Sequence, residues 1–132
     1  MEIIDIIKKI DEQQLFVPAF QREYVWKREN AKDLIRSLIK TYPTGAFLTW
    51  ATNAPPELKG AYVHEASRGS VKLILDGQQR TTTLYMLITG EIPPYYTEDG
   101  ITNNIFDMHV NLETLDLEYY KKSVMESDPS WV

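Results

Sequence analysis

A strand, a glycine turn and a helix follow one another in residues 71–90, VKLILDGQQRTTTLYMLITG. The first five residues are aliphatic apart from one lysine, and their alternation predicts a half-buried to fully buried strand. Asp76-Gly77 breaks this pattern. The apolar residues that follow recur at helical spacing as far as Gly90, a residue typical of the position just after a helix. This arrangement directs the first N–H groups of a helix, which carry partial positive charge, toward any ligand above the strand end.

Arg80 lies in the first turn of the predicted helix, where a cation opposes the helix dipole. An anion bound at the same end would make this arginine favourable, and Gln78 and Gln79 add two amide groups at the same place. The alternative interpretation is a plain connection between strand and helix, with a capping aspartate and a solvated arginine. Asp-Gly turns are common, and both interpretations fit these residues.

Length and composition indicate an ordinary globular domain. The chain has 132 residues, 43% hydrophobic and 25% charged, which suits one domain with a sizeable core. The absence of cysteine excludes a disulfide framework, a cysteine nucleophile and a thiolate metal site. The sequence has no signal peptide and no apolar run long enough to span a membrane, so we expect a cytoplasmic protein without a membrane partner.

Charge is distributed unevenly along the chain. The formal net charge of −5 argues against tight, non-specific DNA binding by the whole surface. Residues 1–90 carry 12 Lys and Arg against 10 Asp and Glu, whereas residues 91–132 carry two lysines against nine acids. A surface that binds anions is therefore expected in the first ninety residues.

Hydrophobic periodicity predicts the remaining elements. The expected elements are a short amphipathic helix over 3–10, a brief strand at 15–17, a helix over 28–42, a buried strand at 46–50, a loop over 51–70, a strand over 105–112 and a weak, acidic helix over 115–125. The apolar face predicted for the helix 28–42 includes Ala31, Leu34, Leu38 and Ile39. We expect this helix to serve as scaffold.

Residues 20–26, FQREYVW, alternate aromatic and polar side chains. An extended backbone would place Phe20, Arg22, Tyr24 and Trp26 on one side. Gln21 and Arg22 could then contact a phosphate, a base or a carboxylate. Alternatively, the aromatic residues belong to the core and Arg22 pairs with an acid.

Three sequence blocks follow one another along the chain: VPAFQREYVW, then YPTG followed by AFLTW, then LILDGQQRTTTL. Together they resemble the N-terminal domain of GmrSD-type, modification-dependent restriction systems, a family that looks like a branch of the ParB/sulfiredoxin-like superfamily. The resemblance implies an α+β fold with a small mixed sheet flanked by helices. It implies a nucleotide-binding domain over 1–112, with 113–132 as an acidic C-terminal segment that begins a region truncated here.

In that family the DGQQR block marks a site that binds and hydrolyses nucleotides, and the FQR block lies beside it. By resemblance, the nucleotide-binding residues are Gln21, Arg22, Gly77, Gln78, Gln79 and Arg80. The same resemblance implies that Asp76 and Arg80 are catalytic. Asp76 would hold Mg²⁺ or orient water, and Arg80 would stabilise phosphate charge. The implied cofactor is a nucleoside triphosphate with Mg²⁺, and the absence of cysteine excludes the reductase chemistry of sulfiredoxins.

The function implied is that of a nucleotide-binding, NTP-hydrolysing sensor or regulator in an anti-phage DNA restriction system. Its partners would be nucleotide, modified DNA bound through the full-length protein, and a His-Asn-His nuclease domain in cis or in trans. The chain holds no His-Asn-His block, so we expect nuclease activity only with that domain or partner. Two alternatives stay open: a non-hydrolysing switch that binds nucleotide or DNA, and a ParB-like nuclease.

Overall fold

The computed structural model describes residues 3–19, 21, 24–40, 48–60, 69–96, 101 and 104–132. Contacts divide the chain into two compact units, each assembled from two stretches of sequence. Unit 1 comprises Met1–Val25 and Gly45–Thr102, and unit 2 comprises Trp26–Thr44 and Asn103–Val132. The division predicted at residue 112 falls within unit 2.

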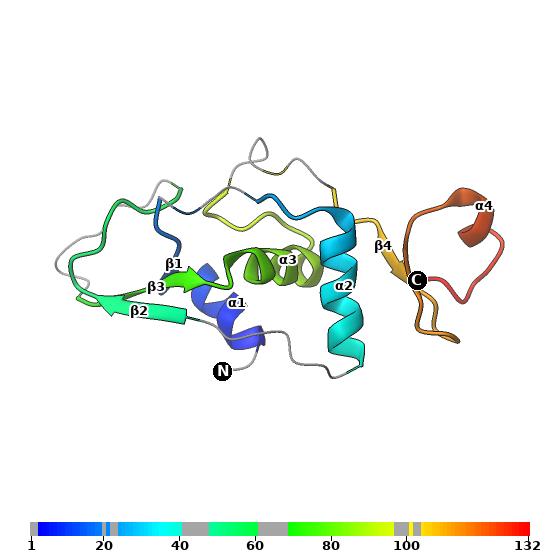
Figure 1. The fold of residues 1–132 in the computed structure, drawn as a ribbon, viewed down its shortest axis with the longest axis horizontal. Coiled ribbons are helices and arrows are strands. Elements are labelled where there is room, and N and C mark those ends of the chain that lie inside the picture. Colours follow the sequence, from blue (N-terminus) through cyan, green and yellow to red (C-terminus); the bar gives the residue numbers. More distant parts are fainter. Residues whose placement is uncertain are drawn as a thin grey trace. The chain divides into compact units, whose positions relative to one another are not determined.

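A mixed β-sheet forms the centre of unit 1 (Figure 1). Strand β3 (Val71–Asp76) lies between β1 (Leu15–Phe16), which is parallel to it, and β2 (Leu48–Thr52), which is antiparallel. One face of β3 packs into a hydrophobic cluster. This cluster comprises Phe16, Leu58, Val71 and Leu73, with Leu75 packed against it. Together with the helices, this confirms an α+β fold with a small mixed sheet.

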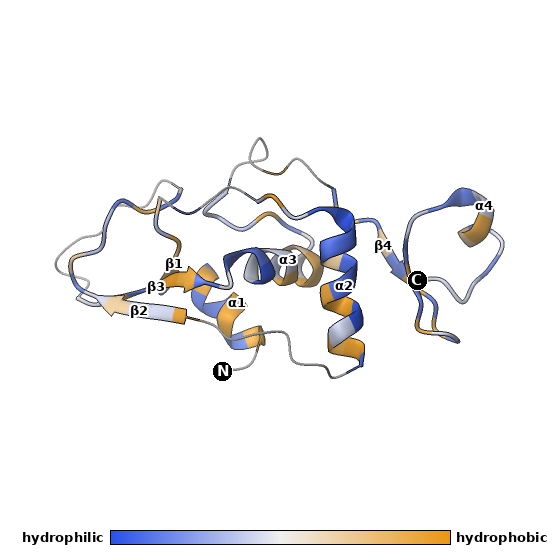
Figure 2. Ribbon diagram, viewed as in Figure 1, coloured by the Kyte–Doolittle hydropathy of each residue, from blue (hydrophilic) through white to orange (hydrophobic). Residues whose placement is uncertain are grey.

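Two helices accompany this sheet. Helix α1 (Ile3–Asp11) contacts β1 and α3 (Gln78–Thr89), and its buried residues are Ile6, Ile7 and Ile10. Helix α3 ends at Gly90, whose left-handed φ of 73° and N–H bond to the Met86 carbonyl form the predicted glycine stop. Figure 2 shows that α3 is hydrophilic in its first turns and hydrophobic toward its end. The strand, turn and helix predicted in residues 71–90 are thus confirmed.

Strand β2 corrects the prediction of a buried strand at 46–50. Leu48 is 56% exposed and Trp50 is 46% exposed. The reason is its position, because β2 lies at an edge of the described sheet and pairs with β3 along one side. Residues 46 and 47 lie outside the described residues. Part of the predicted loop 51–70 is also structured, since Leu58 is buried and pairs with Pro18.

Unit 2 contains α2 (Arg28–Ile39), β4 (Met108–Val110), β5 (Leu117–Tyr119) and α4 (Lys122–Met125). The predicted strand at 105–112 is confirmed as the shorter β4. The weak helix predicted over 115–125 is wrong in its first half, because residues 117–119 pair with β4 in an antiparallel hairpin. The Asn111 side chain causes this turn, since its Oδ1 accepts the N–H groups of Glu113 and Thr114 at 2.9 and 3.0 Å.

The buried face of α2 differs from the predicted one at both ends of the helix. Ala31 and Leu34 are buried as expected, but Ile39 is 38% exposed and Leu38 is only half-buried. Lys32, predicted on the solvated face, is 7% exposed. Its Nζ lies 3.2 Å from Oε1 of Glu118 on β5, so a charge pair compensates for this burial. Residues 41 and 42 of the predicted helix lie outside the described residues.

The Lys32–Glu118 pair predicts a pH dependence. The hydrogen bond from Lys32 lowers the pKa of Glu118 below the ordinary 4.5. A carboxyl whose pKa falls on folding stabilises the fold above its unfolded pKa, and this contribution is lost as the pH drops through the folded pKa. We expect wild-type unfolding free energy, measured in urea, to fall more below about pH 4.5 than that of Glu118→Gln.

The matched control for this experiment is Glu126→Gln, because the Glu126 carboxylate lies 4.0 Å from Lys122 on the exposed surface. It should retain the wild-type acid response. Identical pH profiles for wild type and Glu118→Gln would contradict the stabilising role of the pair.

Candidate functional site

The candidate site is the turn between β3 and α3 in unit 1. Gly77 precedes the helix with a left-handed φ of 91°, a conformation that a glycine adopts at no steric cost. Oδ1 of Asp76 accepts the N–H of Gly77 at 2.9 Å, while the Asp76 residue remains exposed. The turn is therefore braced by its own aspartate, which caps the glycine N–H rather than the helix itself.

The two glutamines after the turn bind groups of the protein. Gln78 is 5% exposed, and its Nε2 donates a hydrogen bond to the Tyr96 hydroxyl. Oε1 of Gln79 accepts the N–H of Val25 at 2.9 Å. Gln78 thus anchors the segment after α3, and Gln79 anchors the segment before α2. Their predicted role as nucleotide ligands stays a prediction.

Arg80 is half-buried in the first turn of α3, and this turn holds no acidic residue. The predicted convergence of the FQR block on the turn involves two residues. Gln21 lies where expected, because its Nε2 donates to the Leu75 carbonyl, one residue before Asp76, at 3.2 Å. Arg22 lies outside the described residues, so its position at the site remains a prediction.

Sequence reasoning missed the three threonines that follow Arg80. Thr83 Oγ1 lies 2.7 Å from the Tyr24 hydroxyl, and Thr82 Oγ1 lies 3.0 Å from the Tyr95 hydroxyl. Thr81 Oγ1 donates to the Gly77 carbonyl at 2.8 Å. Threonine is a poor helix former because its side chain competes for backbone groups, so three in succession were a signal of buried polar partners.

Burial favours the protonated form of these tyrosines. Tyr24 is 1% exposed and Tyr95 is 4% exposed. Burial raises the pKa of both hydroxyls above the ordinary 10.0, and the threonine hydrogen bonds only partly oppose this. Burial thus widens the pH range over which both hydroxyls stay protonated and hydrogen-bonded to the threonines.

Two other kinds of feature, a metal-ligand cluster and a membrane-spanning helix, are absent from the described residues. Among its residues, no three His, Asp or Glu side chains gather as a ligand set for a metal ion. The predicted role of Asp76 as a Mg²⁺ ligand stays a prediction. None of the described helices has the length and apolar character needed to cross a membrane.

Comparison with known proteins places the chain in a family. Residues 3–130 match the model of the GmrSD restriction endonuclease N-terminal domain. A relative, an uncharacterized protein of Methanocaldococcus jannaschii, is 32% identical over 130 aligned positions that cover 80% of this chain. The chain spans 22% of the length of that relative. The protein therefore belongs to the family of N-terminal domains of GmrSD restriction endonucleases.

Proposed function

We propose that this domain binds a nucleoside triphosphate at the Asp76–Arg80 turn and hydrolyses it. One observation carries the proposal: two sequence blocks more than fifty residues apart meet at this turn. Gln21 reaches the end of β3, Gln79 holds the backbone of Val25, and Thr83 holds Tyr24. These contacts bring polar groups from a second segment to the turn, as a binding site assembled from two segments requires.

The chemistry of the turn suits phosphate. Gly77 has no side chain, so phosphate oxygens can approach the backbone at the start of α3, where the helix dipole favours negative charge. The Arg80 guanidinium can donate two parallel hydrogen bonds to a phosphate group. Arg22 would add a second guanidinium from the neighbouring block. These features support binding of a polyphosphate rather than of an uncharged ligand.

Hydrolysis would transfer the γ-phosphoryl group to water. The water oxygen bonds to the γ-phosphorus, the bond to the bridging oxygen breaks, and a nucleoside diphosphate and inorganic phosphate leave. Asp76 would orient this water or hold Mg²⁺, and Arg80 and Arg22 would stabilise the charge on the phosphoryl oxygens. Mg²⁺, when bound, would neutralise part of the phosphate charge.

The family membership supports a place in DNA restriction. The relative is several times longer than this chain, and we propose that a His-Asn-His nuclease domain in cis or in trans acts with this one. Nucleotide turnover would then regulate cleavage of modified DNA, as a phage-defence sensor does. In this proposal the domain binds free nucleotide, and the full-length protein binds modified DNA.

The first test is release of inorganic phosphate from ATP and GTP by the whole chain, with Mg²⁺ and with EDTA. We expect turnover that requires Mg²⁺. Binding without turnover would instead favour the non-hydrolysing switch. A parallel assay with supercoiled plasmid tests the alternative of a ParB-like nuclease. Nicking by this chain alone would make the domain a nuclease in its own right.

Tyr24→Phe tests whether the buried hydroxyl pair positions the FQR block. The variant keeps the ring and removes the hydrogen bond to Thr83, at a cost of about 1 kcal/mol in unfolding free energy. We expect a several-fold rise in the nucleotide Kd, measured by calorimetric titration, because Gln21, Tyr24 and Val25 would be less firmly held beside the turn.

Tyr95→Phe is the matched control. It removes the equivalent hydrogen bond between a buried tyrosine and Thr82, but it leaves the hydrogen bond between Tyr24 and Thr83 in place. The two variants should lose similar stability, while only Tyr24→Phe weakens nucleotide binding. Equal changes in Kd would mean that the tyrosines act through general stability alone.

A further inference from the structure

A polar hollow lies at the opposite end of β3 from the candidate site. It has a volume of about 430 Å³, within the range of small-molecule pockets. Its lining residues are Lys9, Glu12, Gln13, Gln14, Ser70, Val71 and Lys72. Lys72 and Asp76 are four residues apart on one strand, so about 13 Å of extended chain separates this hollow from the turn at Gly77.

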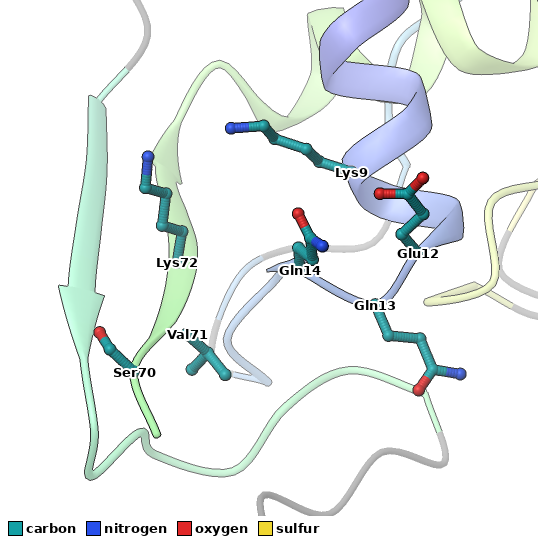
Figure 3. A pocket seen from close by; sticks show the side chains of 7 residues that line it. All are labelled: Lys9, Glu12, Gln13, Gln14, Ser70, Val71 and Lys72. Atoms are coloured by element: carbon teal, nitrogen blue, oxygen red, sulfur yellow. The ribbon is translucent and has the colours of Figure 1, made fainter. Parts of the chain in front are cut away.

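The folding of unit 1 directs two lysines to this hollow. Val71 and Leu73 face the hydrophobic cluster, so strand alternation turns Lys72 to the other face of the sheet. Lys9 belongs to the last turn of α1. Figure 3 shows Lys9 extending from α1 toward β3, with Lys72 on the far side of the hollow and Gln14 between the two elements.

The turn after α1 is built rigidly. Gln13 has a φ of 57°, in the left-handed region that non-glycine residues rarely adopt. Backbone hydrogen bonds from Glu12, Gln13 and Gln14 to α1 carbonyls, 2.9–3.2 Å long, hold this conformation. These bonds end the helix and fix the backbone positions of Gln13 and Gln14, which line the hollow.

The charges at the hollow favour an anion. Among the described residues, neither Lys9 nor Lys72 has a carboxylate within ion-pair distance. Glu12, the acid of the lining, lies 4.0 Å from Lys8. Two ammonium groups, the Gln14 amide and the Ser70 hydroxyl thus offer several donors to one ligand, as a group with many acceptor oxygens requires.

We propose that this hollow is a second anion site, which binds a small molecule through a phosphate or pyrophosphate group. Its concave shape and limited volume suit a small ligand better than a nucleic-acid strand, which would need a longer basic track. The site is separate from the nucleotide site at Asp76–Arg80. The phosphate can belong to free pyrophosphate or to a mononucleotide, since both present the same oxygens.

The test is titration of the whole chain with pyrophosphate and, in a second arm, with AMP, followed by backbone amide NMR shifts. An Arg80→Ala background removes the proposed nucleotide site, so the remaining shifts report on the hollow. We expect shifts at Gln13, Gln14, Ser70 and Lys72. If only pyrophosphate binds, the ligand class is free phosphate compounds. If AMP binds as well, the ligand class also includes mononucleotides.

Single substitutions then assign the lysines. Lys9→Gln and Lys72→Gln should each raise the Kd at least about tenfold, the effect of losing one charge-assisted hydrogen bond. Lys122→Gln removes the same charge from an exposed lysine of α4 that does not line the hollow, and it should leave the Kd within about twofold of that of the parent protein. The proposal is wrong if neither probe shifts these amides at millimolar concentration, or if all three variants weaken binding equally. Failure of nucleotide hydrolysis would leave this result unaffected.

Discussion

Replacing Arg80 with alanine is expected to abolish the thermal stabilisation that a nucleoside triphosphate with Mg²⁺ gives the wild-type protein. A ligand that binds the folded state at about 100 times its Kd adds about 2.7 kcal/mol to the unfolding free energy. Such a gain is a clear upward shift of the melting temperature. The variant loses the guanidinium that meets the phosphate charge at the start of α3. In a Lys72→Gln background, which weakens the separate anion site, its melting curve should therefore be the same with and without nucleotide.

Each protein is compared with its own melting temperature in the absence of nucleotide, which separates loss of binding from loss of stability. Lys8→Ala is the charge-matched control, since Lys8 lies on α1 with a side chain that is 69% exposed. It should retain the full shift. If Arg80→Ala in the Lys72→Gln background stays folded and still responds to every nucleotide, the proposed pocket lies elsewhere. If the variant unfolds, Arg80 is a structural residue.

Leu73→Ala should strongly destabilise the sheet of unit 1. Leu73 is 0% exposed at the centre of β3, and it packs against Phe16 and Leu58. Removing a fully buried leucine leaves a cavity and costs about 2–5 kcal/mol. This is a large part of the roughly 5–15 kcal/mol by which most domains are stable. Urea unfolding followed by far-UV circular dichroism measures the loss.

Leu48→Ala is the matched control on the neighbouring strand, because Leu48 is 56% exposed. The same chemical change should there alter the unfolding free energy by less than about 0.5 kcal/mol. Similar losses in both variants would show that β2 is covered in solution and that the burial difference between the two strands is smaller than the structure indicates.

Local chemistry in the sequence determined the elements nearest the candidate site. The alternation of residues 71–75, the Asp76-Gly77 break and Gly90 were enough to predict β3, the turn and α3 with close boundaries. These features are local, because strand alternation, left-handed glycine and helix ends depend on neighbouring residues only. The paired polar blocks also predicted that Gln21 would lie near the turn, and its amide reaches Leu75.

Only the tertiary structure decided which side chains of these elements are buried and what they bind. Residues 46–50 have the composition of a buried strand, yet β2 is exposed at an edge of the described sheet. Lys32 follows a helical pattern of solvated charges, yet it is buried beside Glu118, 86 residues away. Burial and pairing depend on which distant segment packs alongside an element, and the period of a short stretch carries no information on that partner.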